Sequence, residues 1–343
     1  MGWNMRHGFL VFLSAWVVAG VLSSWPAGAG EWYLDTDVMA AIRRGGNAPA
    51  VIGHVDSGPF GPGEVVLSTN RSIDRGLGVQ LTAGYRWDNR QSIEVSGIGI
   101  MNSGKASAIN VDPGGQDLNA VFCNPFLFAV CPVGGVAGFP EFDQAARIRL
   151  EYDATLIGGE VGYRTRADKH WSWLAGFRYL FLGERLKLVA DDGGGVGGPF
   201  TDTAVYKIRT RNHLFGPQIG VNAAYRFRQR YRLSFAGKGA LLINRASTHS
   251  QVYDDDGNTV RTSNTRHRVA GLLQGRLLLE WTPTKHLTLS AGYGVLFIPG
   301  VSTAPNQLAR GGSVSEFKKH VSGHALYHGP ILRLVLKFQT PGG

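Results

Sequence analysis

The sequence is poor in charged residues and in long apolar runs. Asp, Glu, Lys and Arg make up only 17% of the chain, below the quarter that is usual in soluble domains. One apolar run, at the N-terminus, approaches the length of a membrane-spanning helix, which is about 20 residues. A bundle of membrane helices is therefore excluded. A hydrophobic content of 43% also excludes a disordered chain.

Two features are present in excess. The 48 glycines are about twice the ordinary usage. The 35 basic side chains outnumber the 25 acidic ones, which indicates anionic surroundings or ligands. Because these charges are spread along the chain and not gathered in one patch, we expect no nucleic-acid partner.

The first 29 residues have the order of a secretory signal peptide. A weakly basic start is followed by the apolar run Phe9–Leu22 and by Ala27-Gly28-Ala29. We expect cleavage after Ala29, which leaves residues 30–343 as one domain outside the cytoplasm. The alternative is an uncleaved N-terminal anchor, but the apolar run is short for a bilayer core of about 30 Å.

Cysteine is nearly absent. Cys123 and Cys131 are the only two, and outside the cytoplasm this spacing predicts one local disulfide that contributes about 2 to 3 kcal/mol. A metal site would need further ligands nearby, and we expect neither a metal nor another cofactor.

Most of the remaining chain alternates between apolar and polar residues, which is typical of two-faced β-strands. The segment Leu77–Trp87 is one example. The pattern switches parity once near Gly158, Gly183 and Gly216, where glycine-marked bulges would explain the change. Strands are expected to begin near residues 31, 77, 91, 147, 171, 204, 231, 268, 287 and 326. This predicts an all-β, closed antiparallel barrel of about ten strands, within a range of about 8 to 12.

The connections between these strands alternate in length. Short polar turns stand at residues 88–90, 166–170, 228–230 and 282–286, and long loops at 42–76, 102–146, 190–203, 248–265 and 298–325. Short and long connections therefore lie at opposite rims, as in transmembrane barrels with short periplasmic turns and long extracellular loops. Aromatic residues cluster beside the short turns, as in an interfacial girdle: Trp32, Trp87, Tyr163, Trp171, Trp173, Tyr225, Phe227, Tyr231, Trp281 and Phe338.

A soluble barrel or sandwich is the alternative, because periodicity does not distinguish inside from outside. The nearly pure apolar face, the asymmetric loop lengths and the aromatic residue that ends the last strand favour the membrane. We expect a protein of the outer membrane of a Gram-negative-type bacterium, reached through the periplasm. Its partners would then be outer-membrane lipid and the barrel assembly machinery.

Two motifs resemble a known family. Ala175-Gly176-Phe177-Arg178-Tyr179-Leu180, followed by Glu184-Arg185-Leu186, and Thr210–Gly220 resemble the family numbered seventh among the outer-membrane β-barrel porins. The resemblance covers roughly residues 171–298, and Pro217 stands where that family has a small residue. It implies an outer-membrane location more firmly than any transported solute.

The inward parity of the predicted strands carries charges of both signs. With about ten strands the lumen would be narrow. One hypothesis is a small passive channel with a basic lining that favours small anionic solutes; the other is a salt-bridged, closed interior. Arg149, Glu151, Asp153 and Arg164 are also placed on this parity. The pore-lining candidates are Arg86, Glu94, Glu160, Arg178, Arg232, Lys238, Arg276, Glu280, Arg333 and Lys337.

Two weaker patterns suggest metal ligands. His320, His324 and His328 recur every fourth residue and could hold a metal, although solvated loop histidines explain them as well. The segment 254–258 resembles the start of a calcium loop, but Thr265 stands where the last glutamate ligand should be. A polar hairpin tip is the simpler interpretation.

Two other function classes stay open. A surface hydrolase would use residues of the long loops, namely Asp191, Asp192, Asp254, His249 and His267, but their spacing assembles no catalytic set. We therefore expect no enzyme. A structural or adhesive barrel would use its long loops as the working surface. No feature of the sequence indicates an oligomeric state.

Overall fold

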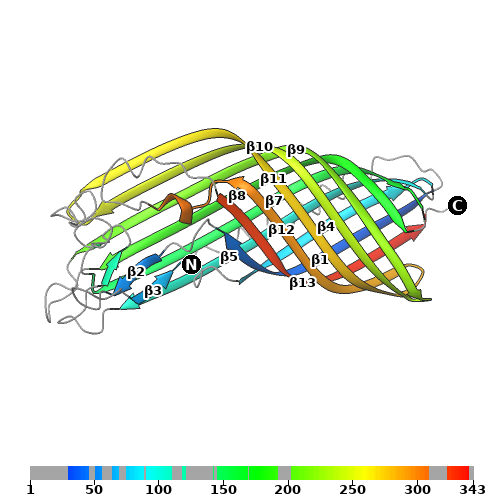
Figure 1. Ribbon diagram of the computed structural model, residues 1–343, viewed down its shortest axis with the longest axis horizontal. Helices are drawn as coiled ribbons and strands as arrows, with labels where there is room; N and C mark the ends of the chain where they lie inside the picture. The colour runs from blue at the N-terminus through cyan, green and yellow to red at the C-terminus, as the bar shows by residue number, and fades with distance from the viewer. Residues whose placement is uncertain are drawn as a thin grey trace.

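The protein is a closed β-barrel in the computed structural model (Figure 1). The structure describes residues 30–45, 51–55, 64–68, 75–88, 90–109, 118–120, 142, 145–168, 170–191, 202–308 and 323–339. The predicted signal peptide and cleavage site, and the predicted Cys123–Cys131 disulfide, lie outside these residues. In the described part of the chain, no helix is long and apolar enough to span a membrane.

Ten antiparallel strands form the barrel wall, which confirms the predicted number. The strand order is β1-β13-β12-β11-β10-β9-β8-β7-β5-β4, and the barrel closes because β1 pairs with both β13 and β4. Closure leaves no unpaired strand edge, which is what hydrocarbon surroundings require. The wall strands are β1 (Glu31–Gly45), β4 (Arg75–Arg86), β5 (Gln91–Ile109), β7 (Arg147–Arg166), β8 (Trp171–Asp191), β9 (Thr203–Arg228), β10 (Tyr231–Asp254), β11 (Thr259–Thr284), β12 (Leu287–Val301) and β13 (Gly323–Gln339).

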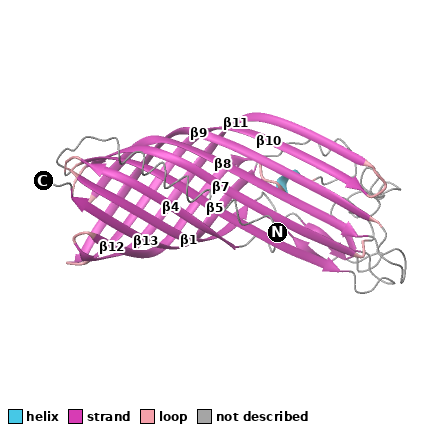
Figure 2. Cartoon of the chain, turned by 180° about the vertical axis from the view of Figure 1, so that it is seen from behind, coloured by secondary structure: helices cyan, strands magenta, loops and turns pink. Residues whose placement is uncertain are grey.

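A small second sheet lies at the end of the barrel that carries the long connections (Figure 1). It consists of β2 (Val51–Val55), β3 (Glu64–Ser68) and β6 (Leu118–Ala120), with β2 in the middle. The 3-10 helix η2 (Pro305–Gln307) follows β12 and is seen from the other side in Figure 2.

Two of the predicted short turns share the same aspartate chemistry. The Oδ1 atom of Asp88 accepts hydrogen bonds from the backbone N–H groups of Arg90 and Gln91. The Oδ1 atom of Asp168 does the same for His170 and for the residue that follows it. Such side-chain bonds to the backbone fix a tight reversal of the chain.

An apolar belt surrounds the short-turn half of the barrel. On β10 it runs from Tyr231 to Ile243, which at about 3.3 Å per residue and a tilt of about 40° is about 30 Å tall. This height equals that of a bilayer core. Aromatic residues of the predicted girdle contact one another, as Trp87 and Tyr163 do with centroids 6.1 Å apart. The exposed belt residues include Trp171, Trp173, Phe177, Tyr179, Phe215, Ile219, Tyr225, Phe227, Leu233, Phe235, Leu241, Val269, Leu273, Leu277, Leu279, Trp281, Tyr293, Val295, Leu332 and Phe338.

The strands continue well beyond the belt, and here the expected loop boundaries are wrong. Strand β10 extends to Asp254 and β11 starts at Thr259, so the expected loop 248–265 is a hairpin with a tight turn. Strand β5 likewise extends to Ile109. In this upper part both faces of a strand can be polar, which removes the alternation that identifies a strand from sequence.

The predicted bulges near Gly158, Gly183 and Gly216 are also wrong. The pairing of β7 with β8 and of β8 with β9 runs through these glycines without a register shift. The inward parity is constant, and what changes is the chemistry of the two faces. Above the belt the outward positions become polar, so Arg149, Glu151 and Asp153 point outward and not into the lumen.

Candidate functional site: the barrel lumen

All ten predicted pore-lining residues lie on the inward face at the level of the belt. Each belongs to an ion pair with another inward side chain. The pairs are Arg86–Glu31, Arg164–Glu94, Arg178–Glu160, Lys238–Glu160, Arg232–Glu280, Arg276–Asp37, Arg333–Asp35, Arg333–Asp37 and Lys337–Glu31. The strands thus bring these residues into one charged layer. Whether they line an open pore stays a prediction.

Glu160 is the centre of this layer. Its carboxylate pairs with Arg178 and with Lys238, and it accepts a hydrogen bond from Gln218 at 3.1 Å. The three charged side chains are 4 to 7% exposed. At this burial an unpaired charge would be costly, so the two cations and the carboxylate stabilise one another.

The carboxylates of the first strand were not among the candidates from sequence. Asp35 accepts a hydrogen bond from Arg333 at 2.7 Å, and Asp37 pairs with Arg276. Glu31, on the same parity, pairs with Arg86 at 3.2 Å. The alternation of these acids with apolar residues in 31–38 was a signal that could have placed them in the lumen.

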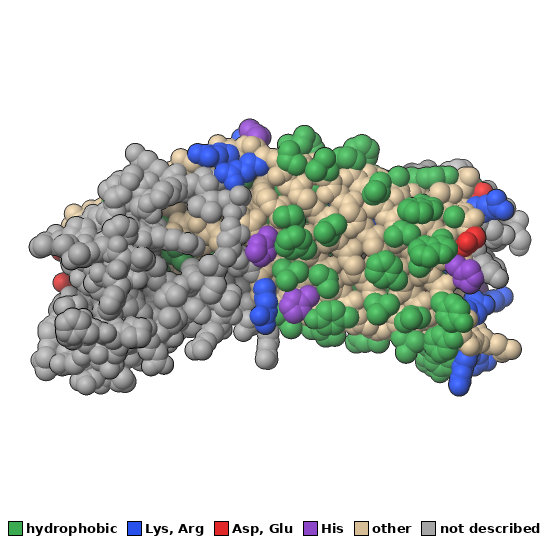
Figure 3. Space-filling model, in the orientation of Figure 1, with side chains coloured by type: hydrophobic (Ala, Val, Ile, Leu, Met, Phe, Trp, Pro, Cys, Tyr) green, Lys and Arg blue, Asp and Glu red, His purple; other side chains and the backbone are tan. Residues whose placement is uncertain are grey.

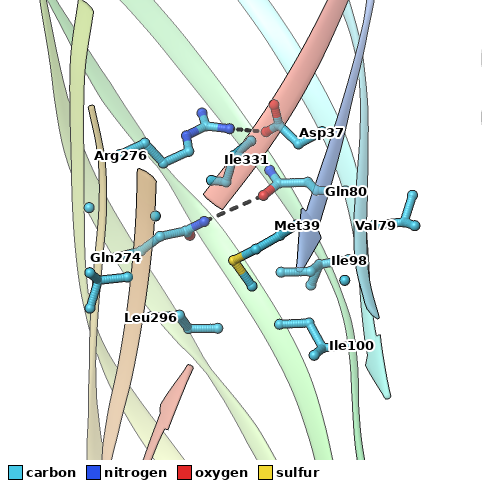
Figure 4. Close-up of a pocket in the computed structure, with 14 residues that line it drawn as sticks. Asp37, Met39, Val79, Gln80, Ile98, Ile100, Gln274, Arg276, Leu296 and Ile331 are labelled. Atoms are coloured by element: carbon cyan, nitrogen blue, oxygen red, sulfur yellow. Dashed lines mark hydrogen bonds and ion pairs between the residues drawn. The ribbon is translucent and has the colours of Figure 1, made fainter. Parts of the chain in front are cut away.

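Polar side chains cross the bore above the ion pairs. Arg178 of β8 donates to Gln274 of β11 at 2.8 Å, and Gln274 donates to Gln80 of β4 at 3.4 Å. Strands β11 and β4 are separated by β12, β13 and β1, so this contact spans the lumen. Figure 4 shows the Gln274–Gln80 contact beside the Arg276–Asp37 pair.

A small cavity lies beside these contacts. Its volume is about 30 Å³, which is room for one or two water molecules. One side is lined by the polar contacts, and the other by Met39, Ile98, Ile100 and Leu296 (Figure 4).

An apolar layer fills the lumen directly above the cavity. A fully buried layer of this kind excludes water in the same way as the core of a soluble domain. Its members come from nine of the ten wall strands, all except β4: Ala41, Ile100, Leu156, Leu180, Leu182, Leu214, Leu242, Ala270, Leu272, Leu296, Ile298, Val301, Ala325 and Tyr327, with Met39, Ile98 and Ala240 packed against them.

The segment after β12 folds into the upper lumen. Residues 302–308, which we call the inward segment, are all buried. Asn212 donates to the carbonyl of Ser302 and accepts from its N–H, both at 2.8 Å. Asn244 donates to the carbonyl of Gly300 at 3.1 Å. These amide contacts hold the chain against the inner wall.

A buried ion pair locks the inward segment to the opposite strands. Arg43 of β1 pairs with Glu184 of β8, and the two side chains are 1% and 0% exposed. The other Glu184 oxygen accepts the backbone N–H of Ala304 at 2.7 Å. The guanidinium lies over the rings of Tyr152 and Tyr327, 5.3 and 5.7 Å from their centroids. Arg43 was not a candidate from sequence because 42–76 was expected to be a loop, and Glu184 was not one because the strand parity was expected to switch near Gly183.

The histidine and calcium patterns have structural explanations in the described residues. His328 Nδ1 lies 2.6 Å from the Tyr293 hydroxyl, and His324 packs on Phe297, while His320 is outside the described residues. Among the described residues, no group of three or more His, Cys, Asp or Glu side chains is arranged to hold a metal. The hairpin tip at 254–258 is confirmed: Asp254 accepts hydrogen bonds from the N–H and side chain of Asn258.

The residues of the hydrolase alternative are not brought together. Asp191 pairs with Arg147 at 2.7 Å and with Arg149 at 3.3 Å. Asp254 is engaged in its hairpin turn. His249 and His267 are exposed on the outer wall, and Asp192 lies outside the described residues.

The barrel wall and its interior define the class of protein. The chain is a membrane-spanning β-barrel with ten strands, an apolar outer belt and an ion-paired lumen that apolar side chains close. No family model matches the chain, so the resemblance to the seventh porin family stays a prediction. No curated protein matches either.

Solved structures of outer-membrane proteins are similar over most of their length. The outer membrane protease OmpT from Escherichia coli has 10% identity and a TM-score of 0.41, with 90% of this chain and 96% of that chain covered. The Pseudomonas putida toluene transporter TodX has 12% identity and a TM-score of 0.33, with 93% and 91% covered. The attachment invasion locus protein Ail of Yersinia pestis has 9% identity and a TM-score of 0.24, with 90% and 99% covered. The fold assignment rests on the strand pairing and not on these likenesses.

Proposed function

We propose that the protein is an outer-membrane surface barrel of a Gram-negative-type bacterium that does not conduct in the described form. The observation that carries the proposal is the filling of the lumen: the Gln80–Gln274 contact crosses it, and a buried apolar layer lies above a cavity of about 30 Å³. The short turns face the periplasm and the long connections face the exterior. Outer-membrane lipid and the barrel assembly machinery are the partners that this location implies.

The working part is then the barrel that projects beyond the membrane. Strand β10 continues from Ile243 at the edge of the belt to Asp254, a length of about 25 to 30 Å along the barrel axis. Its outer face is polar and its interior is packed, as in a soluble domain. Such an extension presents loops away from the lipid surface, which suits adhesion or a structural role.

A gated channel is the second candidate. It is favoured by the excess of cations over carboxylates in the charged layer, where Glu160 faces both Arg178 and Lys238. An anionic solute could pass such a lining only after the apolar layer and the inward segment had moved. The proposed surface barrel needs no such movement.

Single-channel recording in planar bilayers separates the two candidates. The mature protein should give no conductance steps, whereas the double variant Met39→Ser/Leu296→Ser, which opens the apolar layer beside the cavity, should give small steps that favour anions. The matched control Leu332→Ser/Leu334→Ser changes the same number of apolar side chains on the lipid face. Anion-selective steps from the unmodified protein would overturn the non-conducting proposal.

No enzymatic activity is part of this proposal. Refolded protein should hydrolyse neither peptides nor lipids in standard assays. Turnover that disappears in His249→Ala or Asp254→Asn would contradict it and would favour a surface hydrolase.

A further inference from the structure

A group of basic side chains lies on the outer wall just above the apolar belt. We call Arg185, Lys187, Lys207, Arg209, Arg211 and Arg245 the basic cluster. They come from the neighbouring strands β8, β9 and β10 and point away from the lumen. The function proposed above uses none of them. On the face drawn in Figure 3, Lys, Arg and His side chains border the apolar side chains at both ends.

The strand register places like charges directly opposite each other. Arg185 faces Arg209, and two residues further along Lys187 faces Lys207. Side chains at such positions have Cβ atoms about 5 Å apart, and like charges there destabilise the strand pair. The pKa of Arg209 is lowered by burial, by Arg185 and by Arg211. Anions from outside the chain would relieve the repulsion in these two consecutive pairs.

The protein supplies little compensation. Asp153 and Glu151 of β7 stand opposite Arg185 and Lys187, but Glu151 is already paired with Lys105 at 3.5 Å. On the other side, Arg209 faces His249 and Arg211 faces Ser247. Among the described residues, Arg209, Arg211 and Arg245 make no ion pair with any carboxylate. Within this part of the chain these three arginines are therefore uncompensated, whereas Lys207 donates to the Tyr253 hydroxyl at 2.6 Å.

The height of the cluster selects the source of the anions. Arg211 stands four residues beyond Phe215 on β9, and Arg245 stands two residues beyond Ile243 on β10. At the rise and tilt of barrel strands these two positions lie about 5 to 10 Å outside the hydrocarbon, and Arg209, two residues beyond Arg211, lies about 15 Å outside it. Arg245 and Arg211 are thus at or just above the level of lipid headgroups, with Arg209 further out. Guanidinium groups bind phosphate with two parallel hydrogen bonds, which suits a headgroup that carries phosphate.

We propose that the basic cluster binds the phosphate groups of an anionic lipid in the outer leaflet. Arg209, Arg211 and Arg245 form its centre, and Arg185 and Lys207 its edges. The proposal rests on the membrane orientation given above, and it holds whether or not the lumen conducts. The bound headgroup would remove the repulsion between β8 and β9 and anchor the projecting barrel at a fixed height.

Lipid retention by the folded barrel tests the site. The mature protein is reconstituted in vesicles of phosphatidylcholine with or without diphosphorylated lipid A, re-extracted in a zwitterionic detergent, and the lipid phosphorus per protein is measured. The variant Arg209→Gln/Arg211→Gln/Arg245→Gln should lose affinity for lipid A by about tenfold. The control Arg228→Gln/Arg230→Gln/Lys285→Gln removes the same charge from exposed turns at the opposite rim and should retain the lipid.

Each variant should fold, because the changes are confined to exposed positions. Heat-modifiable migration in detergent gels checks this. Lipid A should raise the temperature of the gel shift for the unmodified protein and for the rim control only. Equal losses in the two triple variants, or no loss in either, would overturn the site. A further sample contains inorganic phosphate and phosphatidylcholine vesicles without lipid A. If free phosphate raised the gel-shift temperature as much as lipid A does, the assignment to a lipid headgroup would be overturned.

Discussion

Strand β8 carries Phe177 outward and Arg178 inward in its lower half, but Arg185 outward and Leu186 inward in its upper half. The backbone pairing is continuous between these two positions, so one regular strand presents opposite chemistry to its two faces. The surroundings explain the difference. In the proposed membrane orientation, lipid covers the lower outer face, where apolar residues are stable, while water covers the upper outer face, where they are not.

The interiors of the two halves also differ in chemistry. The lower lumen holds many charges, and each of the predicted lining residues has a partner of opposite sign. The upper lumen is packed with apolar side chains and contains the deeply buried pair Arg43–Glu184. A barrel with about ten strands is too narrow for a wide aqueous channel, so both halves fill their bore, one with ion pairs and the other with a core.

The largest effect should follow from loss of the deep pair. Glu184→Gln leaves Arg43 charged and buried, and it weakens the contact to the Ala304 N–H. We expect the free energy of unfolding to fall by about 3 to 5 kcal/mol, measured by guanidinium unfolding of the reconstituted barrel. The matched control is Glu151→Gln, whose pair with Lys105 is 44% and 81% exposed and should matter little. Similar small losses for both variants would show that the upper lumen is wet.

A charge placed on the outer wall tests the belt itself. Leu277→Arg puts a cation on the lipid face of β11, where Leu277 is 51% exposed, and should cost about 2 to 4 kcal/mol. Thr259→Arg adds the same charge to the exposed upper end of the same strand, where water solvates it. The two unfolding free energies, measured in vesicles, should differ by that amount. Equal values would mean that lipid does not cover the lower outer face.

The sequence predicts the lower half of the barrel well. The expected strand starts near 91, 171, 231 and 287 coincide with those of β5, β8, β10 and β12, because the alternation there is strong and short turns bound it. All ten expected lining residues are inward for the same reason. Acids such as Asp37 were recoverable from the parity of the first strand but were not selected.

The upper half was harder to predict, for a physical reason. In the β10–β11 hairpin, small polar residues such as Ser250 are buried inside while polar residues such as Gln251 stand outside, so neither face gives an apolar signal. Near Gly183 the outward side chains of β8 change from apolar to charged and the inward ones from charged to apolar. If the surroundings of the strand are assumed to be the same along its length, this change looks like a bulge. The Arg43–Glu184 pair joins strands that only barrel closure brings together, and no local pattern encodes it.

An intermediate effect is expected from release of the inward segment. Asn212→Ala removes both hydrogen bonds to the backbone of Ser302 at a buried position, which should cost about 2 kcal/mol. Thr210→Val is the control on the same strand, since the buried Thr210 hydroxyl has no partner within the described part of the chain. Guanidinium unfolding gives the stability, and added protease reports release of residues 302–308. An Asn212→Ala protein as stable and protease-resistant as Thr210→Val would show that packing alone holds the segment.

The smallest effect belongs to the periplasmic rim, where the ion pairs of the lower lumen meet water. The Arg86–Glu31 pair spans 3.2 Å, and its side chains are 27% and 29% exposed, so solvent screens the attraction. Arg86→Gln should therefore cost about 0 to 1 kcal/mol, and less at high salt. The same change at Arg178, which is 4% exposed beside Glu160, should cost several times more and should be insensitive to salt. If the two losses match, water reaches Glu160 as freely as it reaches Glu31, and the lower lumen is an open vestibule up to the apolar layer.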